Sequence, residues 1–473
     1  MSKAKLLACL VGASVSCLLG VAAGSADETY TVKTIIPVPG GLTSFDIAFV
    51  DANINTFVLA DRTNKSIDVV DTATNTLTHQ FTASPPFRGV FNPGGLANAS
   101  GPNGAIIVDQ REIWATDAPV LTCSGTPQVC TVVTPSSIKV IDLATGATTH
   151  VIPNGGVRRA DELCEDVKHE IVLSANDDAL DNFLNFISTE TYSILATVKL
   201  DGSDPNGRIT LSGVTVPPGA KVAADGIEQC KFNPRTGFYY LAIPATSIIP
   251  TSGTPTAGPG VVLKISRHAP FRVVETITIP ASSGCTGPQG LAIGPRHEIQ
   301  LGCGGTASPI IDDRSSGTAT IIAPGAGEGG ADEVWYNPGN NSFFIARSGA
   351  GKLGVVDAGG NESKAPQADA DVTTTIGSHV VAADMRRNQI YVPVRANTVA
   401  GTCSVAGCAT LCGPAGSPGA AQGCIAVLTA PNDDKCLAQG MPVLDHDDGD
   451  DPVFMRTRCR DHDDDDHDRV AHR

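Results

Sequence analysis

Polar residues recur at one position of a repeated segment along this chain. In each copy, the first residue of a pair precedes a turn-forming residue by five positions, and an apolar strand begins four to six residues after the second. The pairs are Asp46/Asp51, Gly104/Asp109, Asp161/Asp166, Glu228/Asn233, Gln289/Gly294, Asp332/Asn337 and His379/Asp384. Four carboxylates, an amide and an imidazole facing one point would repel one another unless a cation or a basic ligand lay among them.

Carboxylate oxygens favour Ca²⁺ or Mg²⁺, and a histidine also admits a transition metal. The candidate metal ligands are the four carboxylates of the set: Asp46, Asp161, Glu228 and Asp332. In a metal-dependent hydrolase, the cation would polarise a carbonyl group and His379 could serve as the general base. Alternatively, these residues and Gln289 only hydrate a water-filled channel, and Gly104 leaves a gap in the set.

Four short strands separated by turns make up each repeat. Residues 44–60 align without a gap with residues 330–346, and a third strand follows each segment, at residues 67–71 and 353–357. Seven such repeats predict an all-β fold, a seven-bladed β-propeller, because each repeat needs only its neighbours to bury a core. Six or eight blades are the alternatives, since the second and fifth repeats match least closely. The first strand of each propeller blade lines the central channel, so the first members of the pairs would face the axis near one mouth.

The two ends of the repeat array complement each other. Residues 28–37 form an isolated strand pattern before the first repeat, whereas the seventh repeat stops after a third strand at residues 424–429. The N-terminal strand is therefore predicted to complete the last blade and close the ring, which removes an exposed sheet edge. The propeller domain would span residues 27–430.

Two segments carry a resemblance to known repeat families. Residues 59–76, LADRTNKSIDVVDTATNT, resemble a repeat of the YVTN β-propeller family, and residues 287–295, GPQGLAIGP, are similar to the opening of an NHL-type repeat. The resemblance covers residues 29–430 and implies the propeller fold. It leaves the function open, because these families include adhesins, scaffolds, lactonases and electron-transfer partners, and a fold does not fix a function.

Long insertions indicate where a partner would bind. Residues 117–136, 244–260 and 395–423 lie between second and third strands, and residues 83–103 and 201–222 precede first strands. Because strand directions alternate, both kinds of loop would emerge on the face where the first strands begin. Loops gathered on one face of a rigid scaffold usually form a binding site, although surface loops also tolerate insertion at little cost.

The functional hypothesis is accordingly a binding module that uses this loop-rich face around the channel. Its partner would be a protein, a glycan or a small-molecule ligand. No Gly-x-Ser-x-Gly, His-Glu-x-x-His or Cys-x-x-Cys-His motif occurs, so no catalytic motif is complete. The alternative is a lactonase-like, metal-dependent hydrolase with a divalent cation in the channel. The net charge of −16 argues against a nucleic-acid partner.

The first 26 residues are typical of a secretory signal peptide. Lys3 and Lys5 precede an apolar run at residues 6–21, and a cleavage site follows Ala26. The run is too short for a confident membrane span, so no transmembrane segment is expected in the mature chain. Lipidation at Cys17 is disfavoured by its sequence context. The expected location is secreted or periplasmic.

Cysteines and the C-terminal tail complete the picture. Two of the 14 cysteines lie in the predicted signal peptide, and the 12 others form an even set that predicts disulfides in an exported protein. The suggested bridges are Cys123–Cys130, Cys164–Cys230, Cys285–Cys303 and two among Cys403, Cys408, Cys412 and Cys424, with Cys436 and Cys459 left for the tail. A zinc site at 403–424 is the alternative. Residues 431–473 contain Asp/His-rich runs and are expected to be largely disordered; they could chelate metal loosely or act as a solubility tail.

Overall fold

The computed structural model describes residues 29–91, 99–126, 128–177, 182–359, 365–396, 411–412 and 422–430. The predicted signal peptide, the tail from residue 431 and most of the 395–423 insertion lie outside the described residues. Within the described residues, regular structure is almost entirely β-strand, with two 3-10 helices at Val167–His169 and Ala281–Ser283. Over the same residues, no helix has the length and apolar character needed to cross a membrane.

Antiparallel sheets follow one another in chain order, and they are numbered here from the N-terminus. Sheet 1 contains β2 (Ala48–Asp51), β3 (Thr56–Asp61), β4 (Ser66–Asp71) and β5 (Thr76–Phe81). Sheet 2 contains β6 (Ala105–Val108), β7 (Glu112–Asp117), β10 (Ser137–Asp142) and β11 (Thr148–Pro153). Sheet 3 contains β12 (Ala160–Asp166), β13 (Ile171–Asn176), β14 (Phe183–Ser188) and β15 (Ile194–Lys199).

The later sheets repeat this order of strands. Sheet 4 contains β17 (Cys230–Asn233), β18 (Phe238–Ile243), β21 (Val261–Ser266) and β22 (Val273–Thr278). Sheet 5 contains β23 (Pro288–Ile293), β24 (Glu298–Cys303), β25 (Ile310–Asp312) and β26 (Ile321–Ala323). Sheet 6 contains β27 (Val334–Asn337), β28 (Ser342–Arg347) and β29 (Lys352–Asp357), with β30 (Gln367–Ala368) and β31 (Val372–Thr373) both paired to β29. Sheet 7 contains β32 (Ala382–Asp384), β33 (Gln389–Val394), β34 (Cys424–Thr429) and β1 (Thr31–Pro37).

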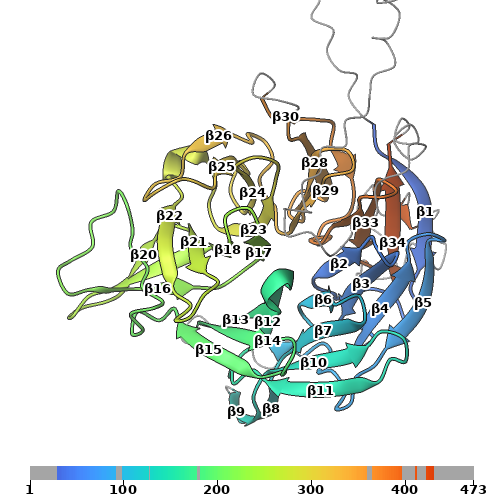
Figure 1. Ribbon diagram of the computed structural model, residues 1–473, viewed down its shortest axis with the longest axis horizontal. Coiled ribbons are helices and arrows are strands. Elements are labelled where there is room, and N and C mark those ends of the chain that lie inside the picture. Colours follow the sequence, from blue (N-terminus) through green and yellow to red (C-terminus); the bar gives the residue numbers. More distant parts are fainter. Residues whose placement is uncertain are drawn as a thin grey trace, which may run out of the picture.

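The sheets are arranged in chain order around a common centre (Figure 1). The innermost strand of each sheet contacts the innermost strand of the next, and β32 of sheet 7 contacts β2 of sheet 1. The N-terminal strand β1 pairs antiparallel with β34, with Thr31 opposite Thr429 and Pro37 opposite Cys424, as the sequence predicts. Figure 1 shows this pairing as a blue strand beside a red one.

Burial falls from the inner strands to the outer edge of each sheet. The second strands, such as β3, β7, β24, β28 and β33, are buried along their whole length because sheets pack against both of their faces. The outer strands β5 and β15 are mostly exposed. Apolar clusters lie between neighbouring sheets; one joins Val58 and Ala60 of sheet 1 to Ala105 and Ile107 of sheet 2. Burying each large apolar side chain contributes about 1.5–3 kcal/mol.

Insertions of both predicted kinds meet at one end of sheet 4. β16 (Lys221–Asp225) precedes the first strand, while β19 (Ala245–Ile249) and β20 (Thr256–Gly258) lie between the second and third strands. These three strands form one extra sheet in the order β16-β19-β20. The prediction that both kinds of loop emerge on the same face is therefore confirmed for this sheet.

A similar junction holds the insertions of sheet 2. The Arg88 amide donates to Asp117 Oδ1 at 3.1 Å, and Lys139 Nζ donates to the Pro86 carbonyl at 2.9 Å and to Asp117 Oδ2 at 2.6 Å. Beyond Asp117, β8 (Val120–Ser124) and β9 (Val129–Thr134) form a separate hairpin. The segment that precedes the first strand of sheet 2 is thus attached to the end of its second strand, β7.

Four disulfides occur among the described residues, and all four join pairs that the sequence suggests. They are Cys123–Cys130, Cys164–Cys230, Cys285–Cys303 and Cys412–Cys424. Cys164 lies on β12 and Cys230 on β17, so their bridge connects sheets 3 and 4. Cys403, Cys408, Cys436 and Cys459 lie outside the described residues.

Candidate functional site

A repeated backbone pattern identifies the equivalent channel residues. The amides of Asp46, Glu228 and Asp332 each donate to a carbonyl at the end of the second strand. The residue after each of them donates its amide to the channel residue of the next sheet: Ile47 to Asn103, Gln229 to Gln289 and Glu333 to His379. We call the end of the innermost strands that carries these residues the mouth, and the opposite end, where first and second strands join, the turn end.

This pattern makes Asn103, rather than Gly104, the channel residue of sheet 2. The Asn103 amide donates to the Thr116 carbonyl at 3.0 Å, as the equivalent residues do, and the glycine gap expected at Gly104 is wrong. Counting back five residues from Asp109 fails because the equivalent of Asp51 is Val108, and the turn between β6 and β7 is one residue shorter than the turn between β2 and β3. A Cβ atom on Gly104 would lie 2.2 Å from the Asp161 carbonyl oxygen, so the close approach of the neighbouring sheet requires glycine.

Two arginines that the sequence reasoning missed lie among the channel residues. Arg62 Nη2 forms an ion pair with Asp46 Oδ2, and Arg62 Nε donates to Asn103 Oδ1 at 3.0 Å. Arg159 Nη2 lies 2.7 Å from Asp161 Oδ2, and its Nε donates to Asp177 Oδ2 at 3.2 Å. Both side chains are mostly buried, with 13% and 17% exposed. The carboxylates of sheets 1 and 3 therefore have cationic partners supplied by the chain itself.

A sequence signal for Arg159 does exist in the repeat. Two residues before the channel residue, sheets 4 to 7 carry glycines with positive φ, Gly226, Gly287, Gly330 and Gly377. Sheet 3 carries Arg159 at that position instead. Arg62 follows the second strand of sheet 1, outside the repeated interval, and only its contacts place it at the axis.

His379 is held between Asp46 and its own loop. Its Nε2 lies 3.3 Å from Asp46 Oδ1, its Nδ1 lies 2.8 Å from the Gly377 carbonyl, and its ring stacks on Phe45. Burial opposes the charged form, but the Asp46 hydrogen bond and the nearby Asp332 carboxylate raise the pKa of His379 overall. Nδ1 must donate to the Gly377 carbonyl, and the Asp46 carboxylate favours a proton on Nε2 as well. A general base would need one free lone pair, so that predicted role requires the Asp46 contact to break.

The carboxyl groups at the mouth differ in charge. Burial tends to raise the pKa of Asp46, but Arg62, His379 and Arg159 outweigh it and hold that pKa well below the usual range. Burial, together with repulsion from Asp46, raises the pKa of Asp161 to about 8 despite Arg159. Near neutral pH the mouth therefore combines an ionised Asp46 with a largely protonated Asp161.

In the other half of the ring, no arginine of the described chain forms an ion pair with a channel residue. Glu228, Gln289 and Asp332 are half-buried, and their side chains form no hydrogen bond or ion pair with the rest of the described chain. Burial raises the pKa of Glu228 well above its usual value; attraction to Arg159 opposes this rise, and repulsion from Asp161 and Asp332 adds to it. Burial also raises the pKa of Asp332, against the attraction of His379. This side of the mouth offers polar groups that are available to a partner.

A second polar layer lies one residue along the channel. Glu162 and Glu333 are buried, and burial together with mutual repulsion raises the pKa of Glu162 well above its ordinary value. Burial also raises the pKa of Glu333; interaction with the Glu162 carboxyl group opposes this rise, and repulsion from Asp332 adds to it. Gln229 Oε1 accepts from the amides of Leu291 at 2.6 Å and Val334 at 3.2 Å. These contacts tie sheets 3 to 6 together beneath the mouth.

The four predicted metal ligands do not form a compact donor group. Among the described residues, one group of three acidic or histidine side chains has donor atoms within 4.8 Å, and it consists of His297, Asp312 and Asp313. Two contacts already occupy this group: Arg314 donates to Asp312, and His297 Nδ1 lies 2.8 Å from Asp313 Oδ1. A cation at the mouth would have to compete with Arg62 and Arg159, and the divalent-cation site stays a prediction.

Comparisons with known proteins identify the fold. No protein-family model matches the chain, and no curated protein matches it in sequence. In structure it is similar to Kuenenia stuttgartiensis hydrazine synthase, with a TM-score of 0.50 and 12% identity over 78% of this chain and 96% of that one. It is also similar to U3-55K (TM-score 0.50, 8% identity, 85% and 100%) and to the WD40 β-propeller domain of Doa1 (TM-score 0.50, 7% identity, 85% and 97%). The chain is thus an all-β protein with the fold of a β-propeller; identities this low show the fold alone.

Proposed function

We propose that the chain is an exported, seven-bladed β-propeller of the YVTN/NHL type, closed by β1 in the last blade, that serves as a binding module. Its partner, a protein, a glycan or a small-molecule ligand, would bind the loop-bearing mouth. The disulfides support an oxidising location. The continuous contacts between innermost strands support the closed ring.

The observation that carries the proposal is the coincidence of the polar ring with the insertions. In sheet 4 the extra sheet β16-β19-β20 joins the chain two residues after Ile243, beside the position of Glu228. In sheet 2 the insertions meet at Asp117, one residue beyond Thr116, which binds Asn103. Partly exposed polar side chains flanked by loops on a rigid scaffold suit recognition of a polar partner. No observation favours the lactonase-like hydrolase over this binding module.

The test compares substitutions at the mouth with a substitution at the turn end. A Glu228→Gln, Asp332→Asn double variant replaces two carboxyl groups at the mouth by amides with little change in volume, while Glu190→Gln changes an exposed acid in the turn between β14 and β15. A glycan and metabolite panel, read by melting shift, would be run with wild type and both variants. A ligand of the mouth should lose most of its shift in the double variant and keep it in Glu190→Gln. A ligand that behaves the opposite way would refute binding at the mouth.

A further inference from the structure

Two parts of the polar ring at the mouth contain side chains of the same kinds in the same order. Sheets 1 to 3 contribute an acid, an amide and an acid, namely Asp46, Asn103 and Asp161. Sheets 4 to 6 repeat this order with Glu228, Gln289 and Asp332. We call the first set the arginine arc and the second set the open arc, because they differ in the cations that they hold.

Guanidinium groups of the chain itself occupy the arginine arc. Arg62 Nη2 forms an ion pair with Asp46, and Arg62 Nε donates to Asn103 Oδ1 at 3.0 Å. Arg159 Nη2 lies 2.7 Å from Asp161 Oδ2. A planar guanidinium group presents several donors in a fixed fork, which suits neighbouring carboxylate and amide oxygens. The molecule thus contains its own example of a group that the order acid, amide, acid accommodates.

The open arc is left accessible by the glycines that precede it. Sheet 3 carries Arg159 two residues before its channel residue, whereas sheets 4, 5 and 6 carry Gly226, Gly287 and Gly330 there, all at positive φ. An added Cβ atom on these glycines would have its nearest heavy atom, outside the adjoining residues, at 3.6, 4.0 and 3.7 Å respectively. No side chain therefore fills the position that Arg159 takes in sheet 3, and the partly exposed groups of the open arc can be approached from solvent.

Two further carboxyl groups lie beneath the open arc without a donor. Glu162 and Glu333 are buried, and their carboxyl groups accept no hydrogen bond from a donor of the described chain. Burial raises the pKa of both, although both are attracted to Lys231. Buried polar groups are normally satisfied, so this layer favours a ligand that brings positive charge and N–H donors.

We propose that the open arc binds the guanidinium group of a ligand, which donates to Glu228, Gln289 and Asp332. This inference rests on the proposed binding at the mouth and names the chemistry of the partner. A small metal ion fits less well, because among the described residues no three acidic or histidine side chains of the mouth have donor atoms within 4.8 Å of one another. A guanidinium group carries five donors and reaches oxygens that lie further apart.

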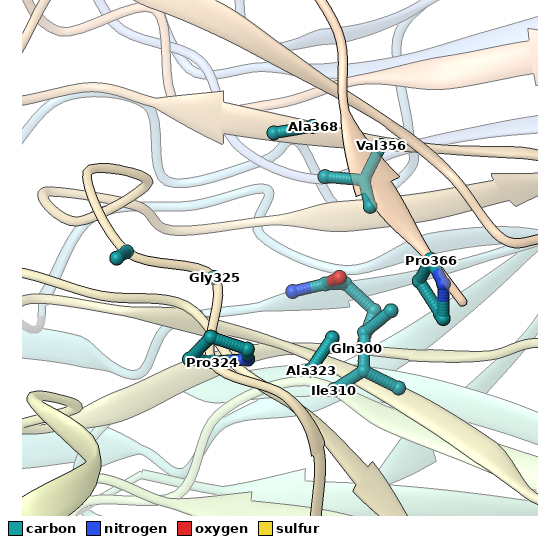
Figure 2. Close-up of a pocket in the computed structure, with 9 residues that line it drawn as sticks. Gln300, Ile310, Ala323, Pro324, Gly325, Val356, Pro366 and Ala368 are labelled. Carbon is teal, nitrogen blue, oxygen red and sulfur yellow. The ribbon is translucent and has the colours of Figure 1, made fainter. Parts of the chain in front are cut away.

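The crevice between the outer parts of sheets 5 and 6 does not offer a second cation site. Figure 2 shows Gln300, Ile310 and Val356 among its lining side chains, and none of the residues that line it is charged. A cation there would lose hydration without compensation, so the argument for a cationic ligand applies to the mouth.

N-acetylarginine amide and N-acetylcitrulline amide form a matched pair of probes, because citrulline keeps the length and planarity of arginine and lacks its charge. Binding to the full-length protein is measured by ligand-observed NMR titration at low ionic strength. We expect the arginine probe to bind more tightly by about tenfold or more, the range of a hydrogen bond to a charged group. The Glu228→Gln, Asp332→Asn double variant should lose this preference, and Glu190→Gln should keep it. Equal affinity for the two probes, or no binding of the arginine probe, would overturn the proposal.

A pH titration of the wild type tests the proposal without any substitution. Burial raises the pKa of Glu228 and of Asp332, so each carboxyl group must lose its proton before it pairs with a guanidinium group. The other charged or titratable groups that face them are Asp46, Asp161, Asp177, Glu333, His379, Arg62 and Arg159. Any of these that titrates becomes more negative as the pH rises, so all act in the same direction. The arginine probe should therefore bind more tightly at pH 9 than at pH 6, and an affinity that is constant or falls would overturn the proposal.

Methylguanidinium distinguishes the two sources of such a group. If it binds as tightly as the arginine probe, a free small molecule suffices; if the arginine probe binds more tightly, the ligand is an arginine side chain of a peptide. Either result supports the open arc as a guanidinium site. A neutral compound whose melting shift is lost in the double variant, with no binding of either guanidinium probe, would overturn this inference and leave the proposed binding at the mouth intact.

Discussion

The mouth and the turn end of the innermost strands are built from the same repeat, yet their polar residues have different partners. At the turn end, buried polar side chains bond directly across the seam between sheets: Thr72 Oγ1 donates to Asp384 Oδ2 at 2.6 Å, and Asn233 Nδ2 donates to Asp313 Oδ2 at 3.1 Å. At the mouth, Asp46 and Asp161 pair with arginines, while Glu228 and Asp332 have no such partner.

The insertions follow the same division. Those whose structure is described, in sheets 2 and 4, leave from the mouth side of the strands. The connections between first and second strands at the turn end are short, with residues such as Asn55 and Asn388 at positive φ. Polar groups of the turn end are used in hydrogen bonds between sheets. The difference indicates that the turn end maintains the ring and that the mouth is free to vary.

The largest effect is expected from breaking a contact between sheets at the turn end. Asp384 is fully buried and accepts from Thr72 and from Arg387 Nη1 at 2.9 Å. Asp384→Ala removes the acceptor of Thr72 and of the Arg386 and Arg387 amides and leaves the Arg387 side chain with Asn55, so it should lower the free energy of unfolding by about 3 kcal/mol in urea titrations. Asp384→Asn keeps an acceptor and serves as the control with a smaller loss. A loss below about 1 kcal/mol for Asp384→Ala would contradict a structural role for the turn end.

A smaller, pH-dependent effect is expected at the mouth. Arg159→Met removes the cation beside Asp161, so the Asp161 carboxyl can no longer ionise without cost. The variant should lose about 2 kcal/mol of stability at pH 9 and less at pH 5, where Asp161 is protonated in both proteins. Melting temperatures at the two pH values measure this difference. Arg159→Lys should recover part of the loss, and an effect independent of pH would argue against the Arg159–Asp161 pair as its cause.

The pH dependence of stability provides a further test at Glu165. Burial, with repulsion from Asp109, Asp166 and Asp51, raises the pKa of Glu165 to about 8. A raised carboxyl pKa stabilises the fold fully below the unfolded value and loses that contribution as pH rises through the folded value. Glu165→Gln should therefore match the wild type near pH 4 and exceed its stability by about 1–2 kcal/mol at pH 9. If stability changes with pH in the same way in the wild type and in Glu165→Gln, the raised pKa of Glu165 is refuted.

The smallest effect is expected from metal removal. Because Arg62 and Arg159 already lie against the carboxyl groups of sheets 1 and 3, EDTA should change the melting temperature of the protein by less than about 1 °C. Elemental analysis of the chain with and without residues 445–473 separates metal held by the Asp/His tail from metal in the channel. A stoichiometric ion that survives truncation, and whose removal lowers the melting temperature, would favour the hydrolase alternative.

Much of the architecture could be predicted because its causes are local. Turn-forming residues at regular intervals and short apolar strands predict the repeating sheets, and the unpaired strand pattern at residues 28–37 predicts the β1–β34 pairing. Cysteine positions relative to strand ends predict the bridges Cys164–Cys230 and Cys285–Cys303. Each of these inferences uses the number of residues between two points of the chain. The rise per residue of a β-strand turns that number into a distance in space.

The composition of the mouth depends on contacts between distant segments. Asn103 replaces Gly104 because the turn between the first two strands of sheet 2 is one residue shorter, and the hydrogen bond from Ile47 reveals the resulting register. Arg62 reaches the axis from outside the repeated interval, and its ion pair with Asp46 helps to keep that carboxyl group ionised. The sequence by itself determined the strands, their order and the polar character of the channel. Only the tertiary structure decided which charges meet there, because the long arginine side chains leave their own strands and reach the axis in directions that spacing along the chain does not specify.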